Sequence, residues 1–414
     1  MSDVRQVTVQ PSSQRLAVLF ILATLALDAI GYGLIMPVMP DLLRSVTGGD
    51  LARAALWGGV LTGGFAVMQF LCGPVIGNLS DRFGRKPVLL GSLAVLTGDY
   101  IVLALAASVW LILAGRLVTG AASSTFGTAS AYLADISSPQ QRAQRFGLIG
   151  AAYGIGFVLG PALGGMLAQY GIRAPFVAAA VIAGANLLFG LLVVRETLAP
   201  RHRRPFEWRR ANPFGTFRAI GRLPGLGRFL VIYTAYEFAF TVYPVIWAYY
   251  AIARFDWTPG QVGLSLALYG VGFALVQGVL IRPALRALGR GGTIALGLVA
   301  AALSFAVLVW ISNGVLALAM VPVSTLSGLV MPALRAEMTD RVAPSQQGEL
   351  QGALASLHAF GMIAAPLIYT RVFALFTGAG AILDLPGMVF AVPSALSLAA
   401  LLLLWRVRFE RSAP

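Results

Sequence analysis

Five ionisable side chains lie inside long apolar segments of this sequence, where charged residues are rare. A charged side chain at the centre of a bilayer costs roughly 3 kcal/mol or more on insertion scales. Residues of this kind usually face a cavity, where they bind protons, ions or polar substrates. We therefore predict that five residues take part in proton binding and release: Asp28, Asp99, Arg116, Glu237 and His358.

Two of these residues carry opposite charges and are candidates for an ion pair. An arginine is always charged, so Arg116 needs a carboxylate partner or water, and we expect Asp28 to be that partner. A neighbouring guanidinium favours the ionised carboxylate, whereas burial favours the protonated form, so a balanced site can load and release a proton. The alternatives are a fixed structural ion pair, or an Asp28 carboxyl group held in place by hydroxyls or amides.

Each of the other three residues has a functional and a structural interpretation. Asp99 is flanked by about ten apolar or small residues on each side, which favours a cavity over a hydrated helix end. Glu237 could bind a polar or cationic group of a substrate or a second proton, or only a tyrosine hydroxyl. His358 could relay protons, because histidine titrates near working pH, or it could simply be hydrogen-bonded.

Aromatic side chains are concentrated around Glu237. They are Tyr233, Tyr236, Tyr243, Trp247, Tyr249 and Tyr250. Aromatic rings with a polar edge suit an amphipathic ligand. We predict that Tyr236, Tyr243 and Trp247 contact a substrate.

Membrane-spanning helices must position these residues, because the composition excludes an ordinary soluble protein. The chain has 414 residues, of which 58% are hydrophobic and 11% charged, whereas soluble domains are about 25% charged. Each membrane span needs about 20 apolar residues. We predict an all-α integral membrane protein with 12 spans at residues 16–42, 55–79, 88–107, 110–133, 146–169, 175–194, 228–252, 261–281, 292–311, 314–335, 349–373 and 384–405.

The spans fall into two sets of six, separated by a basic segment. Residues 1–194 form the predicted N-terminal six-helix bundle and residues 228–414 the C-terminal one. Residues 195–227 form a cytoplasmic linker, and nine arginines lie between Arg195 and Arg228. A short amphipathic helix is expected near Phe214–Ile220.

The distribution of basic residues predicts the orientation of the chain. With both termini in the cytoplasm, 24 of the 30 Lys and Arg residues lie on the cytoplasmic side and five on the outside, as the positive-inside rule requires. The net charge of +14 then reflects loops that face anionic lipid. We therefore expect no nucleic-acid partner.

A dense charge cluster, GNLSDRFGRK at Gly77–Lys86, interrupts two apolar segments. It cannot lie in hydrocarbon, so we predict a tight turn at the cytoplasmic face. Gly77 and Gly84 would allow close backbone approach and a positive φ. The same pattern returns weakly 205 residues later, where Arg282, Arg286, Gly289 and Arg290 align with Gly77, Asp81, Gly84 and Arg85. Such an internal repeat indicates two repeated halves around a central cavity.

A glycine-rich segment, Gly150–Gly165, has glycines at four-residue spacing, which flattens one helix face for close helix contact. Packing alone would also explain it. The sequence has no G-x-x-x-x-G-K-[ST] phosphate loop and no catalytic triad or metal-ligand pattern. We therefore expect no enzyme activity, no cofactor and no metal site. The single cysteine, Cys72, cannot form an intrachain disulfide.

The chain resembles a known family over nearly its whole length. The segments LDAIGYGLIMPVMPDLL, GNLSDRFGRKPVLL, GDYIVLALA, GRLVTGAA, GIGFVLGPALGG and SQQGELQGALASL resemble the tetracycline/proton antiporters, 12-helix exporters of the major facilitator superfamily. The resemblance implies transport roles for Asp28, Asp99 and Arg116, and polar positions at Gln69 and Gln277, which we predict to contact the substrate. It also implies a gating loop at Gly77, Asp81, Arg82, Gly84 and Arg85, and an antiporter motif at Gly156, Gly160, Pro161 and Gly164.

The second half departs from this family. Its best-known members carry an aspartate and a histidine where this chain has Ala301 and Phe273, so Glu237 is expected to compensate. We expect a proton-coupled antiporter that exports a small amphipathic drug, tetracycline-like, by alternating access. The alternative is a metabolite symporter or facilitator of the same fold, whereas a non-transporting sensor is disfavoured. We expect a monomer in a bacterial inner membrane.

Overall fold

The computed structural model describes residues 11–123, 125–208, 212–213, 223, 225–378 and 380–407. Within these ranges the chain is helical and contains no strand. The short helix expected near Phe214–Ile220 lies outside the described residues.

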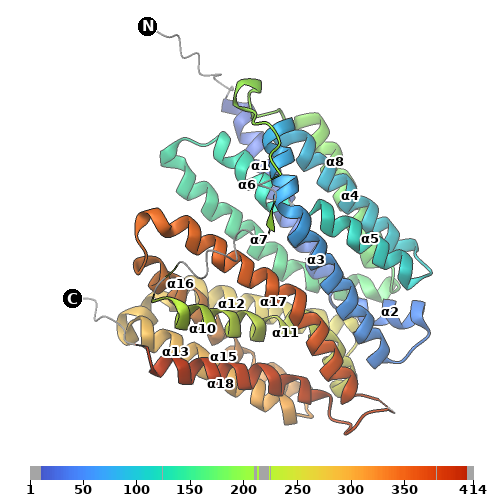
Figure 1. Ribbon diagram of the computed structural model, residues 1–414. Helices are drawn as coiled ribbons and strands as arrows, with labels where there is room; N and C mark the ends of the chain where they lie inside the picture. Colours follow the sequence, from blue (N-terminus) through green and yellow to red (C-terminus); the bar gives the residue numbers. More distant parts are fainter. Residues whose placement is uncertain are drawn as a thin grey trace.

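The helices before the linker form what we call the N-terminal half. They are α1 (Pro11–Ile35), α2 (Met39–Thr47), α3 (Leu51–Phe83), α4 (Arg85–Leu105), α5 (Val109–Ala122), α6 (Thr125–Asp135), α7 (Pro139–Leu167) and α8 (Ala174–Val193). In Figure 1 they occupy the upper right of the molecule.

The helices after the linker form the C-terminal half, at the lower left of Figure 1. They are α10 (Gly227–Phe240), α11 (Val242–Phe255), α12 (Pro259–Leu275), α13 (Ile281–Trp310), α14 (Gly314–Ala319), α15 (Val321–Thr325), α16 (Val330–Asp340), α17 (Gln347–Leu375) and α18 (Ala391–Trp405). A π-helical turn, Val276–Leu280, joins α12 to α13.

The predicted count of twelve membrane spans agrees with these helices. Eleven helical segments of the described chain are long and apolar enough to cross a membrane. One of them, Pro259–Trp310, has 52 residues, which is far more than the roughly 20 that a crossing needs. It bends sharply at Gly289, where φ is 65°, so it represents two crossings.

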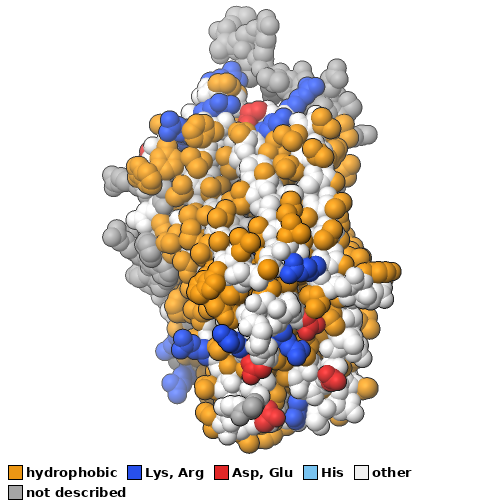
Figure 2. All heavy atoms as spheres, turned by 90° about the vertical axis from the view of Figure 1, so that its right-hand side faces the viewer, with side chains coloured by type: hydrophobic (Ala, Val, Ile, Leu, Met, Phe, Trp, Pro, Cys, Tyr) orange, Lys and Arg blue, Asp and Glu red, His pale blue; other side chains and the backbone are white. Residues whose placement is uncertain are grey.

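Hydrophobic side chains cover the outside of the molecule, as a protein surrounded by lipid requires. Leu192, Leu105 and Trp310 are 86%, 71% and 71% exposed. Figure 2 shows a largely hydrophobic surface between groups of Lys and Arg toward the two ends of this face. The exposed tryptophans Trp110, Trp310 and Trp405 lie at helix ends, where aromatic rings suit the membrane interface.

The largest contacts between the halves are those of α3 with α17 and of α7 with α12, and α11 also contacts α3. Glycines make the close contacts possible. A Cβ on Gly59 would collide with Pro366 and Thr370, and a Cβ on Gly263 would collide with the backbone oxygen of Pro161. The α3–α17 contact at Gly59 lies far from the Gly77–Lys86 loop, because 25 residues along α3 separate Gly59 from Gly84. We call the end with that loop the loop end and the opposite end the closed end.

The hydrophobic cores differ between the two ends. At the closed end a single cluster of buried side chains includes residues of both halves, such as Leu42, Tyr100, Tyr249 and Phe373. At the loop end each half has a separate cluster, one around Phe20 and the other around Tyr233. The halves are therefore packed together at the closed end and hold separate cores at the loop end.

Candidate functional site

Arg116 binds Asp99, not the predicted partner Asp28. Its Nε donates to Asp99 Oδ1 at 3.3 Å, and its Nη2 also contacts Asp99 Oδ2. The Asp99 side chain is only 1% exposed. Gly115 leaves room for the carboxylate, because a Cβ there would lie 2.8 Å from Asp99 Oδ1. The prediction was wrong because it ignored the neighbouring helix.

The α4–α5 hairpin explains this pairing. The two helices are joined by only Ala106–Ser108, so they run antiparallel side by side. Asp99 and Arg116 are nearly equally far in sequence from the middle of this turn, Ala107, at eight residues before it and nine after it. Residues equidistant from such a turn lie at the same height, because each helix rises about 1.5 Å per residue. This nearly equal spacing was the sequence signal that could have identified the pair.

Asp28 is left without a counter-charge. It is half-buried in α1, and within the described chain its carboxyl group has no hydrogen-bond or ion-pair partner. It interacts electrostatically with Tyr100 of α4 and Tyr153 of α7. Gly31, one turn further along α1, gives the Tyr100 hydroxyl space, because a Cβ there would collide with it.

In the C-terminal half, Glu237 and His358 come together. His358 Nδ1 lies 2.8 Å from Glu237 Oε2, and this contact joins α17 to α10. Tyr233 interacts with the same carboxylate. Arg335 Nη2 donates to the Tyr233 hydroxyl at 3.3 Å. Sequence reasoning named Glu237 and His358 separately and missed Arg335.

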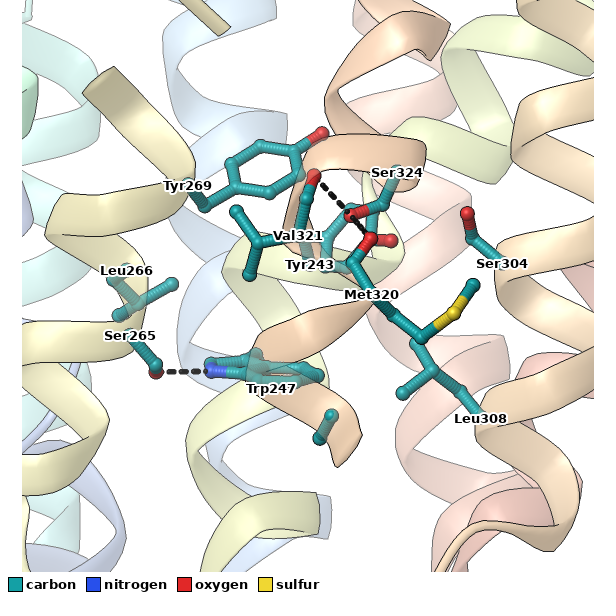
Figure 3. A pocket seen from close by; sticks show the side chains of 11 residues that line it. Tyr243, Trp247, Ser265, Leu266, Tyr269, Ser304, Leu308, Met320, Val321 and Ser324 are labelled. Atoms are coloured by element: carbon teal, nitrogen blue, oxygen red, sulfur yellow. Dashed lines mark hydrogen bonds between the residues drawn. The ribbon is translucent and has the colours of Figure 1, made fainter. Parts of the chain in front are cut away.

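The predicted substrate residues do not form one site. Tyr243 and Trp247 line a narrow pocket within the C-terminal half, together with Ser265, Tyr269 and Ser324 (Figure 3). In this pocket Trp247 Nε1 donates to Ser265 Oγ at 2.8 Å, and Ser324 donates to the backbone oxygens of Met320 and Val321 (Figure 3).

The other three predicted substrate residues lie elsewhere. Tyr236 donates to the backbone oxygen of Ser327 at 2.8 Å. Gln69 donates to Ser123 at 3.2 Å in the N-terminal half. Gln277 is exposed on the π-helical turn. Of the three aromatic residues predicted to contact a substrate, Tyr243 and Trp247 line the pocket, whereas Tyr236 does not.

A second pocket, which we call the inter-half pocket, lies between the two halves, where the sequence repeat predicted a central cavity without naming its lining residues. It encloses about 730 Å³ of space that is partly open. Tyr32, Phe65 and Arg116 line it from the N-terminal half, and Pro244, Val245 and Tyr249 from the C-terminal half. It is mainly apolar, and the Arg116 guanidinium provides a positive group on its wall. Its composition suits an amphipathic ligand with a polar or anionic edge.

The charged loop is a tight turn between α3 and α4, as predicted. Gly84 alone links the two helices and has a φ of 110°. Arg85 binds Asp81 at 2.6 Å and Asp135, at the end of α6, at 3.4 Å. The Arg82 guanidinium lies 5.1 Å from the centre of the Phe83 ring.

One expectation for this loop was wrong. Gly77 lies inside α3 without a positive φ, and a Cβ there would meet no atom within 4 Å. It therefore provides neither a turn nor a close approach in this conformation.

Glu196 anchors the loop and was missed by sequence reasoning. Its carboxylate accepts hydrogen bonds from the backbone N–H groups of Arg85 and Lys86 at 2.9 and 3.1 Å, at the start of α4. It also accepts from the N–H groups of Thr197 and Leu198. A carboxylate at a helix N-terminus satisfies free N–H groups and complements the helix dipole. The linker beyond it also contacts the N-terminal half, where Arg204 N donates to the backbone oxygen of Asp81.

The same arrangement occurs 205 residues later. Gly289 has a positive φ, like Gly84. Arg290 binds Asp340 at 2.5 Å and Glu337 at 3.2 Å. Asp340 follows Asp135 by the same 205 residues. The weak sequence repeat therefore coincides with a structural repeat of the loop.

The glycines at four-residue spacing fit α7 against α1. A Cβ on Gly156, Gly160 or Gly164 would collide with the α1 backbone. Pro161 presents its backbone oxygen to Gly263 of α12. Helix α7 thus packs closely against its own half on one face and against the other half on another, at the closed end.

Metal chemistry has no visible basis in the described residues. No group of three or more His, Cys, Asp and Glu side chains gathers there in a way that could hold a metal ion. Cys72 is a free thiol.

The comparisons with known proteins agree with this architecture. The sequence profile of the Major Facilitator Superfamily matches residues 21–366. The chain is 39% identical to the class C tetracycline resistance protein of Escherichia coli, and the match covers 86% of this chain and 90% of that protein. Among solved structures, it resembles the human organic anion transporter MFSD10 (TETRAN), with 27% identity, a TM-score of 0.67 and coverage of 95% and 100%. The nucleoside transporter NupG superposes with a TM-score of 0.75 at 14% identity, over 95% and 98% of the two chains.

The extent of these matches defines the class of this protein. The family profile spans well over half of the chain, and the similar MFSD10 structure is that of a transporter. The predicted all-α fold with 12 membrane helices is confirmed. The chain therefore belongs to the major facilitator superfamily and is a multi-pass membrane transporter, not an enzyme.

Proposed function

We propose that this transporter exports a small amphipathic drug in exchange for protons, with a tetracycline-like compound as the first candidate. The similarity to tetracycline resistance proteins over most of both chains supports a drug as the substrate. The transporter would act in a bacterial inner membrane with both termini in the cytoplasm, and as a monomer. Lipid, protons and the drug are its expected partners, and nucleic acid is not.

The observation that carries this proposal is the isolated carboxyl group of Asp28. A half-buried carboxylate without a counter-charge is costly in a membrane, and protonation removes that cost. Asp28 can therefore alternate between a protonated state and an ionised state that needs water or a cationic group beside it. A proton and a cationic group of the drug would each neutralise the Asp28 carboxylate and would therefore compete for it. Such competition is the requirement for exchange.

The difference between the two ends of the molecule supports alternating access. A shared core at the closed end and separate cores at the loop end suit a state that is accessible from the loop side. The opposite state would require the halves to part where the glycines of α7, α12, α3 and α17 now meet, and to approach at the Gly77–Lys86 loop. In the cycle that we propose, Asp81 and Arg85 rearrange at that step.

The experiment uses purified protein in liposomes with an imposed pH gradient. Drug should move in the direction opposite to the flow of protons down their gradient. Asp28→Asn should abolish this exchange while the protein still inserts and folds. A drug-susceptibility panel in an efflux-deficient host, with Asp28→Asn and Glu237→Gln beside the unaltered chain, would identify the compound. Normal pH-driven efflux by Asp28→Asn would refute the proposal.

A second candidate is transport of an organic anion, within the wider alternative of a metabolite transporter. Arg116 lies on the wall of the inter-half pocket, and the MFSD10 structure belongs to an organic anion transporter. Protonation of Asp99 would release Arg116 to bind an anionic group. Uptake of a labelled organic anion into energised vesicles, lost in Arg116→Gln, would favour this candidate, whereas efflux of a neutral drug would favour the first.

A further inference from the structure

The acid–base pair in the C-terminal half has the geometry of a proton-binding site. Glu237 of α10 and His358 of α17 are 121 residues apart in sequence, yet His358 Nδ1 lies 2.8 Å from Glu237 Oε2. The Glu237 carboxylate is 15% exposed and the His358 side chain 53% exposed. The carboxylate is thus mostly buried, while about half of the imidazole surface is exposed.

The contact fixes which ring nitrogen can take up a proton. A neutral imidazole that faces a carboxylate donates through its near nitrogen, here Nδ1, and has its free lone pair on Nε2. A proton from water would then bind Nε2, and the imidazolium that forms would be stabilised by the Glu237 carboxylate. Release of the same proton to water restores the neutral ring, so protons balance and no other reactant is needed.

Uptake of this proton would change the net charge of the group of residues around Glu237 and His358. Arg335 of α16 binds the Tyr233 hydroxyl, and its guanidinium lies 5.8 Å from the centre of the Tyr233 ring. Tyr233 also interacts with Glu237. Tyr236 on the same helix donates to the backbone oxygen of Ser327 instead. With a neutral His358, the charges of Glu237 and Arg335 cancel, and proton uptake gives this cluster a net positive charge.

Pseudo-symmetry relates this cluster to the Asp28 region. A shift of 205 residues carries Asp28, Tyr32 and Tyr153 onto Tyr233, Glu237 and His358. In the N-terminal half Tyr153 interacts with both Asp28 and Tyr32, so these three residues also lie together.

The same shift holds in the neighbouring elements. It relates the loop glycines Gly84 and Gly289, which both have positive φ. It also relates Pro161 within α7 to Pro366 within α17. The two clusters therefore occupy equivalent places in the two halves, and the carboxyl group has moved by one helical turn between them.

We propose that Glu237 and His358 form a single proton-binding site in the C-terminal half, equivalent to the Asp28 site in the N-terminal half. Each half of the transporter then binds its own proton. This inference rests on the proposed proton exchange for its role in transport, but the existence of the site can be tested without transport.

The chain has only two histidines, His202 and His358, which makes a direct test practical. The full-length protein is labelled with ¹⁵N-histidine, reconstituted in nanodiscs and followed by NMR from about pH 5 to pH 9, the range in which histidine titrates. His202→Asn assigns the two signals. His202 lies on the linker, far from α10 and α17 in sequence, and acts as the internal control.

The expected result is that the His358 signals report proton uptake and that Glu237→Gln changes the midpoint of this uptake, because a close counter-charge is lost. The midpoint of His202 should stay unchanged, and so should that of His358 in Glu349→Gln, a glutamate in the first turn of α17. A His358 that does not titrate, or one that titrates identically with and without Glu237, would overturn the inference.

A transport measurement then separates this inference from the proposed function. The number of protons exchanged per drug molecule should fall in His358→Asn and in Glu237→Gln. If the unaltered protein exchanges protons and both variants keep its ratio, the second site is refuted and the proposed function stands. If the unaltered protein exchanges no protons, the proposed function fails, whatever the NMR titration shows.

Discussion

Arg116 and Asp99 form an ion pair between adjacent helices, at nearly equal distances in sequence from the α4–α5 turn. The pair places a positive group on the wall of the inter-half pocket and keeps its negative partner buried behind it. The charge state of Asp99 should therefore affect whether the Arg116 guanidinium is free to bind a ligand in the pocket.

The pair predicts a large loss of stability when only one partner is removed. Asp99→Asn leaves a buried guanidinium without its counter-charge, which should cost about 3–5 kcal/mol. Thermal unfolding of the purified protein in detergent measures the change. The double variant Asp99→Asn/Arg116→Gln should be more stable than Asp99→Asn alone, and equal or lower stability would contradict a direct pairing.

The contact between α7 and α1 predicts that two glycines of the same helix differ in their tolerance of alanine. Gly160→Ala places a methyl group against the backbone oxygen of Ile30, whereas Gly150→Ala meets no atom within 4 Å. We expect Gly160→Ala to lose about 1–3 kcal/mol through overpacking. Gly150→Ala is the matched control. Similar melting temperatures for the two variants would show that α7 does not pack as described.

The charged loop offers a second matched pair of glycines. Gly84→Ala has to adopt a φ of 110° and would collide with the Glu196 carboxylate, so we expect a loss of about 1–3 kcal/mol. Gly77→Ala lies in open space within α3 and should gain up to about 1 kcal/mol from helix propensity. Unfolding measurements on both variants decide this, and a destabilised Gly77→Ala would indicate a close contact in another state of the transporter.

Glu196 predicts a local effect on the start of α4. Glu196→Gln removes a charged acceptor of the Arg85 and Lys86 amides, and hydrogen bonds to charged groups contribute about 1.5–3 kcal/mol. Hydrogen exchange should therefore become faster at these two amides. Amides in the middle of α4 serve as the reference, and equal acceleration along the whole helix would point to global destabilisation instead.

Much of this fold could be predicted because membrane spans depend on local composition. Long apolar segments, the arginine-rich linker and the glycine of the α3–α4 turn are all visible in the sequence. The kink at Gly289 was anticipated only through the weak repeat of the loop.

The candidate site was harder to predict because its contacts are tertiary. Glu237 and His358 are each conspicuous in an apolar segment, but only the packing of α10 against α17 brings them together. Glu196 is an acidic residue in a basic linker, and only the folded structure brings it to the start of α4. The aromatic residues near Glu237 were expected to form one substrate site, but Tyr236 and Trp247 make separate hydrogen bonds within their own half.

Proton exchange at Asp28 is tested most directly by proton-driven drug movement in liposomes that contain either the unaltered protein or Asp28→Asn. In the unaltered protein a pH gradient should drive drug transport and drug addition should move protons, and both signals should be absent in a folded Asp28→Asn protein. Exchange that persists at the normal rate in Asp28→Asn would contradict this role of Asp28.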